Sequence, residues 1–210
     1  MRVLVTGAAG VAGQAVCRQL LADTSGAIES VRGADVAPPR EKIEGLDFVR
    51  CDTRTVEDVR HAVTGCDAVV HLAAWHCAHV PPVSDPTIFA VNVDGSYNVF
   101  EACRTEGVKA VAFASSMAFG LGGVYGLTKV IGEDIWRSYA EITGASVASL
   151  RYHDFVPKSY LAFGTKLLRN GVDSRDVASA TVASLKSAYE KKFNRHFMTI
   201  VHTAHGMPDE

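Results

Sequence analysis

The sequence lacks several features that mark specialised classes of protein. Lysine and arginine together number 21 against 23 acidic residues, and this balance does not favour nucleic acid or an anionic membrane as a partner. No apolar run approaches the ~18 residues of a membrane span. The five cysteines form no CxxC pair, so we expect neither a disulfide framework nor a structural zinc site. The start, MRVLVTGAAG, lacks a signal peptide's long apolar region, and we expect a cytoplasmic protein.

The chain of 210 residues instead alternates short apolar runs with longer amphipathic segments. Strands are expected at 1–6, 28–36, 46–50, 67–72, 109–115, 146–151 and 196–201. Helices are expected at 11–22, 55–63, 86–105, 125–143 and 173–189. Strands that alternate with helices of this length are typical of βαβ units and a parallel sheet. The sequence therefore predicts an α/β fold with a doubly wound, Rossmann-like sheet.

A glycine-rich turn follows the first strand and opens the first helix. Its sequence TGAAGVAG gives the pattern G-x-x-G-x-x-G, and its candidate phosphate-binding residues are Gly7, Gly10, Val11, Ala12 and Gly13. Small residues at a helix start let a phosphate approach free backbone N–H groups. Asp35 ends the second strand, 22 residues after Gly13. A carboxylate there accepts hydrogen bonds from the ribose of NAD and repels the 2′-phosphate of NADP. The nearby Arg40 nevertheless keeps NADP as an alternative cofactor.

Further motifs give the chain a family resemblance over nearly its whole length. They are T-G-x-x-G-x-x-G at the start, CDT at 51–53, HLAA at 71–74, YGLTK at 125–129, RY at 151–152 with VP at 156–157, and DSRDVA at 173–178. With these motifs the chain resembles the extended short-chain dehydrogenase/reductase superfamily, and within it the NAD-dependent epimerase/dehydratase family. The resemblance implies NAD as cofactor. It also implies an NAD-binding domain at 1–150 and a small substrate-binding portion at 151–210 that partly returns to the sheet.

The resemblance also assigns individual residues to the cofactor and the substrate. The cofactor residues that it adds are Asp52, Thr53, Leu72, Ala73, Ala74, Asn92, Tyr125, Lys129, Tyr152 and His153. Residues expected to line the substrate pocket are Trp75, His76 and His79. A zinc site at His71, His76, Cys77 and His79 is a weaker interpretation, because the spacing fits no compact site, and we expect no metal.

Tyr125 and Lys129 are four positions apart, so on a helix they share a face. A cation beside a phenol stabilises phenolate, and we expect Lys129 to lower the pKa of Tyr125. Tyr125 would then exchange the hydroxyl proton while hydride moves to or from nicotinamide. A serine would hold the substrate oxygen, and both Ser116 and Ser115 are candidates, with Ser116 preferred.

Two segments depart from the family pattern because they are short. Ser116 and Tyr125 are only nine positions apart, and the segment between Pro157 and Asp173 is also abbreviated. Residues 121–123 are either a real tight turn or a seam where residues of the complete protein are missing. A real turn this short puts the geometry of the serine and the tyrosine in question.

Two function classes therefore stay open. The first is an NAD-dependent oxidoreductase or epimerase that acts on a sugar or nucleotide-sugar, with simple oxidation by a sugar or uronate dehydrogenase as a variant. The second is a non-catalytic NAD-binding sensor or scaffold. The resemblance further implies a homodimer through the helices at 86–105 and 125–143. Glu133 and Asp134, on the second of these helices, are expected to be solvated.

Overall fold

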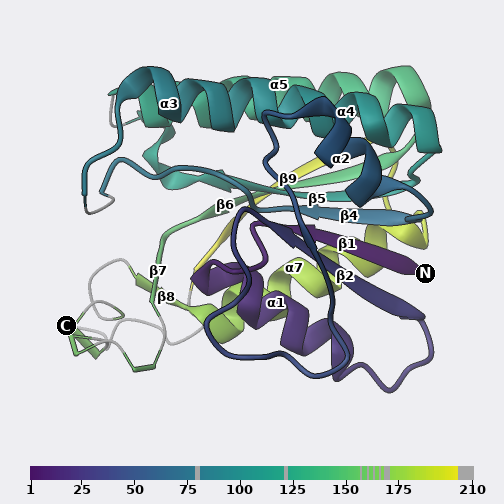
Figure 1. Ribbon diagram of the computed structural model, residues 1–210, viewed down its shortest axis with the longest axis horizontal. Helices are drawn as coiled ribbons and strands as arrows, with labels where there is room; N and C mark the ends of the chain where they lie inside the picture. The colour runs from purple at the N-terminus through teal and green to yellow at the C-terminus, as the bar shows by residue number, and fades with distance from the viewer. Residues whose placement is uncertain are drawn as a thin grey trace.

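The computed structural model describes residues 1–78, 81–120, 123–156, 158–159, 161–162, 164–165, 167 and 171–202. Within this part of the chain, seven parallel strands form one sheet in the order β3-β2-β1-β4-β5-β6-β9 (Figure 1). The strands are β1 (Arg2–Thr6), β2 (Ser30–Asp35), β3 (Asp47–Arg50), β4 (Ala68–His71), β5 (Ala110–Ser116), β6 (Ser146–Tyr152) and β9 (His196–Val201). The predicted doubly wound α/β fold is confirmed.

Helices cover both faces of this sheet (Figure 1). On one face lie α1 (Val11–Leu21) and α7 (Ser174–Tyr189), which pack against each other. On the other lie α2 (Val56–Val63), α3 (Asp85–Phe89), α4 (Gly95–Glu106) and α5 (Gly123–Thr143). Every residue of β4 is buried, as is every residue of β5. Burial on both faces explains why the central strands read as continuous apolar runs.

The prediction of one continuous helix at 86–105 is wrong, because the segment forms three elements. A π-helical turn, η1 (Ala90–Asp94), separates α3 from α4 and carries the buried Asn92. Apolar spacing cannot reveal such a turn, because one inserted residue shifts the pattern only slightly. Turns of this kind are often found at functional sites.

Two elements of the C-terminal part were not expected. Strands β7 (Asp154–Val156) and β8 (Gly171–Asp173) form a small parallel sheet of their own. Three residues are too few to show a periodic pattern, which is why the sequence does not reveal them. The strand β9 pairs with β6 and so returns the chain to the main sheet, as expected. Among the described residues, no helix has the length and apolar character to cross a membrane.

Candidate active site

The glycine turn between β1 and α1 allows a close approach of three backbone segments. Gly7 has a φ of +72°, and a Cβ on it would lie 2.8 Å from the backbone N of Ala73. A Cβ on Gly13 would lie 2.0 Å from the carbonyl oxygen of Gly7. Helix α1 begins after Gly10 without a side-chain cap. The N–H groups of its first turn are therefore available to an anion beside Leu72, Ala73 and Ala74.

Asp35 lies at the end of β2, next to this turn. Its Oδ2 accepts the N–H of Ala9 at 2.9 Å, and its Oδ1 accepts the N–H of Val36 at 2.7 Å. An ionised carboxylate has about four acceptor positions, so two stay available for hydroxyl donors. Asp35 therefore both fixes the glycine turn and offers the oxygens that its predicted contact with a ribose needs.

The predicted adenine-side residues Asp52 and Thr53 follow β3. The carboxylate of Asp52 forms a salt bridge with Arg54 at 2.6 Å, which lowers the pKa of Asp52. Thr53 is buried, and a Cβ on Gly95 would lie 2.5 Å from its Oγ1. Asn98 also donates to the carbonyl oxygen of Thr53 at 2.9 Å. These contacts hold the loop after β3 against α4.

A buried hydrogen-bond network starts at the end of β1 and passes through His71. The hydroxyl of Thr6 lies 2.7 Å from Nδ1 of His71, and Nε2 of His71 lies 3.0 Å from the hydroxyl of Ser96. Ser96 donates to the carbonyl of Asn92, so it must accept from Nε2, and Thr6 then donates to Nδ1. Burial lowers the pKa of His71 to about 3. His71 is thus neutral and has both nitrogens engaged, which argues against it as a zinc ligand.

Asn92 continues this network into the helix that carries the tyrosine. Its side chain accepts the N–H of Trp75 at 2.8 Å and donates to the carbonyl of Trp75 at 3.0 Å. It also donates to the hydroxyl of Thr128 at 2.9 Å, and Thr128 donates to the carbonyl of Tyr125 at 2.8 Å. The sequence pattern pointed to Asn92 but missed Thr6, Ser96 and Thr128. A polar residue in an otherwise buried run was the available signal, because buried polar groups need partners.

Tyr125, Lys129 and Ser116 come together where β5 and α5 meet. The ammonium of Lys129 lies 5.6 Å from the centroid of the Tyr125 ring and donates to the carbonyl of Ala114 at 2.9 Å. Burial lowers the pKa of Lys129 to about 8. The short segment between Ser116 and Tyr125 does not separate them, because the Ser116 hydroxyl lies close enough to the phenol to lower the pKa of Tyr125.

The expected lowering of the Tyr125 pKa is wrong for this structure. Burial raises that pKa, and the hydrogen bond from Ser116 lowers it by less. Cys77 and Asp154 add smaller effects that also raise it, since a negative charge nearby disfavours phenolate. Sequence spacing places a cation near the phenol, but it does not show how much water the fold removes from around it.

The two candidate serines have different surroundings. Ser115 donates to Oε1 of Glu133 at 2.5 Å, whereas the Ser116 hydroxyl acts on the Tyr125 phenol and lowers its pKa. The geometry therefore favours Ser116 over Ser115 as the active serine. Glu133 is buried and also forms a bidentate salt bridge with Arg151, so the expectation that it is solvated is wrong. Asp134 is exposed and pairs with Arg137, as a solvated residue does.

The residues expected around the substrate have mixed outcomes. The ring of His76 packs against that of Tyr125, with centroids 4.5 Å apart, and Trp75 lies one residue before it. His79 lies outside the described residues. Tyr152 is buried, and its hydroxyl lies 2.6 Å from that of Thr181 on α7. Its side chain is thus placed in the core, so the expected cofactor contact of Tyr152 stays a prediction that its backbone would have to meet; the half-buried His153 follows it.

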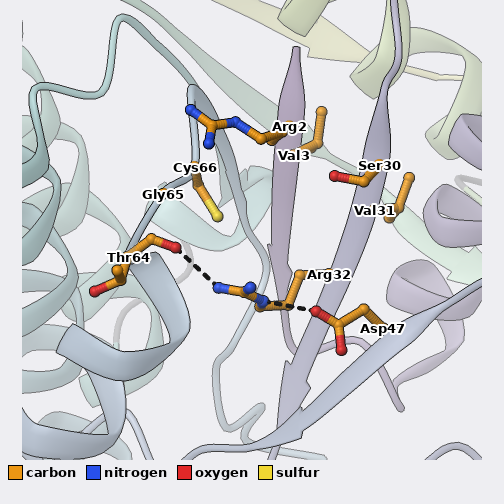
Figure 2. A pocket seen from close by; sticks show the side chains of 9 residues that line it. All are labelled: Arg2, Val3, Ser30, Val31, Arg32, Asp47, Thr64, Gly65 and Cys66. Atoms are coloured by element: carbon orange, nitrogen blue, oxygen red, sulfur yellow. Dashed lines mark hydrogen bonds and ion pairs between the residues drawn. The ribbon is translucent and has the colours of Figure 1, made fainter.

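One cavity of about 130 Å³ lies away from these residues, at the amino ends of β1 and β2 (Figure 2). Two arginines line it, and both have acidic partners: Arg2 pairs with Asp67 at 3.0 Å, and Arg32 pairs with Asp47 at 2.9 Å. In parallel α/β sheets, ligands bind at the carboxyl ends of the strands. The candidate active site is accordingly the one around Tyr125.

Comparison with known proteins identifies the family to which the chain belongs. Residues 3–169 match the NAD dependent epimerase/dehydratase family. The L-arabinose 1-dehydrogenase (NAD(P)(+)) of Haloferax volcanii is 32% identical over 71% of this chain and 65% of its own length. The uronate dehydrogenase of Agrobacterium fabrum is 33% identical over 75% of this chain and 62% of its own. The chain therefore spans a little under two thirds of the length of these relatives.

Solved structures give the same result for the fold. A mutant uronate dehydrogenase from Agrobacterium tumefaciens in complex with NAD is 26% identical, with a TM-score of 0.76. The superposition covers 97% of this chain and 77% of that one.

Proposed function

Since the chain belongs to the NAD-dependent epimerase/dehydratase family, we propose that it is an NAD-dependent oxidoreductase that oxidises a hydroxyl group of a sugar or uronate. The observation that carries the proposal is the buried pair of Tyr125 and Lys129 on α5, with the Lys129 ammonium 5.6 Å from the centroid of the phenol ring and Ser116 at the adjoining end of β5. These groups lie at the same edge of the sheet as the glycine turn.

The residues around the glycine turn fit the shape and charge of NAD. The first turn of α1 would hold the pyrophosphate, because its N–H groups have no side-chain cap and the glycines of the turn let a phosphate approach them. Asp35 would hold the adenosine ribose through its two remaining acceptor positions. When bound, NAD supplies the hydride acceptor or donor of the reaction.

The side chains of the site would handle the proton. Tyr125 Oη would take the proton of the substrate hydroxyl as general base, and would return it in the reverse direction as general acid. Ser116 would donate to the substrate oxygen and stabilise charge on it. Lys129, buried with its ammonium 5.6 Å from the centroid of the phenol ring, would hold the nicotinamide ribose beside Tyr125.

The substrate would lie against His76, whose ring already packs on Tyr125. Trp75 and His79 are the other proposed pocket residues. The names of the two curated relatives, an arabinose dehydrogenase and a uronate dehydrogenase, favour simple oxidation of a sugar or sugar acid. Epimerisation stays a second candidate, because the family includes epimerases.

The test is the appearance of NADH absorbance with a panel of aldoses and uronates. Tyr125→Phe should abolish turnover while NAD still binds in a calorimetric titration. Tyr189→Phe, on the half-exposed Tyr189 of α7, is the matched control and should keep full activity. Full activity of Tyr125→Phe would refute the assignment. NAD binding by the unaltered protein without turnover on any sugar would favour the sensor or scaffold class.

Stoichiometry separates the two catalytic candidates. A dehydrogenase releases one NADH for each sugar oxidised, so NADH accumulates until substrate or NAD is exhausted. An epimerase returns the hydride, so the sugar changes configuration without net NADH. Chromatography of the sugar products beside the absorbance trace distinguishes them.

A homodimer is the proposed assembly. Exposed apolar side chains on α4 and α5, among them Tyr97, Leu127 and Val130, support a contact between two copies there. Light scattering should give twice the chain mass, and Leu127→Asp should give monomers. A cytoplasmic location is proposed from the five free thiols, which suit a reducing compartment.

A further inference from the structure

One buried carboxylate ties the tyrosine helix to two strands. Glu133 lies four positions after Lys129 on α5, with its side chain 8% exposed. Its Oε1 accepts from Ser115 of β5 at 2.5 Å and from Nε of Arg151 of β6 at 2.7 Å, and its Oε2 accepts from the same guanidinium at 2.8 Å. Burial raises the pKa of Glu133, but the hydrogen bonds from Arg151 and Ser115 outweigh it and the net shift is downward. Glu133 is therefore an ionised carboxylate that links α5 to both β5 and β6.

The guanidinium of Arg151 makes a second contact, with an aromatic ring. Its Cζ lies 4.0 Å from the centroid of the Phe119 ring, well within the range of a cation–π contact. Phe119 belongs to η2 (Met117–Gly120), the 3₁₀ turn that directly follows Ser116. The Phe119 side chain is 42% exposed, so packing in the core does not hold it. The ring is thus partly exposed, and the guanidinium of the ion pair lies over it.

The same turn is fixed to both Ser116 and the start of α5. The N–H of Ala118 donates to Oγ of Ser116 at 3.1 Å. A Cβ on Gly126 would lie 2.5 Å from the carbonyl oxygen of Ala118, so turn and helix are in direct contact next to Tyr125. Because the Ser116 oxygen accepts from Ala118, its proton remains available to another acceptor, and the hydroxyl lies close enough to Tyr125 to lower the pKa of that phenol.

We propose that the Glu133–Arg151 ion pair is a positioning device for the candidate active site. It holds Phe119, and with it the η2 turn, so that the Ser116 hydroxyl is directed at Tyr125. Glu133 and Arg151 are positioning residues, since they act through Phe119 and Ser116. The proposal rests on the proposed function for its effect on turnover, but its geometric claim concerns Tyr125 in the protein alone.

Other charged or titratable groups also face Tyr125, and the test must leave them unchanged. They are Lys129 on α5, His76 and Cys77 in the loop after β4, and Asp154 of β7. Substitutions at Arg151 and Phe119 alter none of them. A change in the ionisation of Tyr125 in such variants therefore reports on the Ser116 hydrogen bond.

The experiment measures this ionisation directly. The full chain is labelled with 3-fluorotyrosine, whose phenol is more acidic than that of tyrosine, and each fluorine resonance is followed with pH by NMR. The resonance missing from Tyr125→Phe identifies position 125. Arg151→Lys keeps the charge but loses the bidentate fork and the flat stacking face. Phe119→Leu removes the anchored ring from an exposed position and leaves the ion pair intact.

In both variants the Tyr125 midpoint should rise by about half to one pH unit, because a hydrogen bond of ordinary strength to the phenolate is lost. Asp134→Asn, which breaks the exposed neighbouring pair with Arg137, is the matched control and should leave the midpoint unchanged. Unchanged midpoints in both Arg151→Lys and Phe119→Leu would overturn the proposal. A shift in Arg151→Lys alone would also overturn it, because the route through Phe119 would be wrong.

These outcomes are independent of the proposed function. An unaltered protein that oxidises no sugar would refute the oxidoreductase, yet the fluorine titration would still report the position of Ser116. If turnover is present, the same variants should lower kcat while the dissociation constant of NAD stays within about twofold of the unaltered protein, since Glu133 and Arg151 lie outside the proposed NAD contacts.

Discussion

Replacement of His71 by glutamine should remove the pH dependence that one buried, neutral imidazole gives to stability. In the folded protein burial lowers the pKa of His71 to about 3, from an ordinary 6.5. Between these values the unfolded chain binds a proton at this residue and the folded chain does not. The contribution of neutral His71 to the free energy of unfolding is therefore complete above about pH 6.5 and declines as the pH falls toward 3.

The magnitude follows from these two pKa values. At about pH 5.0 the unfolded state gains about 2 kcal/mol from protonation of this histidine, and at about pH 7.5 it gains almost nothing. The glutamine variant is also less stable at neutral pH, because it cannot engage both Thr6 and Ser96 as the ring does. The free-energy difference between the two proteins should thus be about 2 kcal/mol smaller at the lower pH.

Urea unfolding at the two pH values, followed by tryptophan fluorescence, gives the four free energies that are needed. The double difference cancels the carboxylates, which titrate equally in both proteins. His61→Gln, on the exposed His61 of α2, is the control and should follow the unaltered protein at both values. A double difference near zero for His71→Gln would refute a neutral imidazole that makes hydrogen bonds through both of its nitrogens.

Three further substitutions test the site itself. Gly13→Ala should weaken NAD binding at least tenfold in calorimetry and lower the stability seen in thermal unfolding by about 1–3 kcal/mol, because its Cβ would lie 2.0 Å from the carbonyl of Gly7. Gly10→Ala, whose Cβ would lie 3.3 Å from the same oxygen, is the control and should change both quantities much less. Asp35→Asn should weaken NAD roughly tenfold and reduce the preference over NADP, and an unchanged ratio of dissociation constants would contradict the ribose contact. Ser116→Ala should lower kcat about 100-fold, at least ten times more than Ser115→Ala, and equal losses would count against Ser116 as the active serine.

The fold could be predicted because its signals are local. Buried parallel strands give continuous apolar runs, and the glycine turn after β1 has a pattern that few other structures need. Boundaries differ by a few residues, as for β2, expected at 28–36 and found at Ser30–Asp35. The ends of an element depend on pairing with neighbours, which a single segment does not reveal.

The site was predictable only in part, because several of its contacts join distant segments. Tyr125 and Lys129 share one helix and could be paired from spacing alone. The choice between Ser115 and Ser116 depended on Glu133, whose partner Arg151 lies on another strand. The pKa of Tyr125 depended on how much water the fold removes from the phenol, and composition does not encode that.

The packing of α1 against α7 has a consequence for how the chain acquires its structure. Asp23, just after α1, forms a salt bridge with Lys186, and Gln19 bonds Ser179 at 3.2 Å across 160 positions of sequence. During synthesis six of the seven strands of the sheet emerge before α7, the helix that packs on α1. One face of the growing β1–β4–β5 core stays exposed until α7 arrives, and contacts this distant in sequence form slowly. The nascent protein should therefore need a chaperone, or its own cofactor, most in the interval before residue 174 leaves the ribosome.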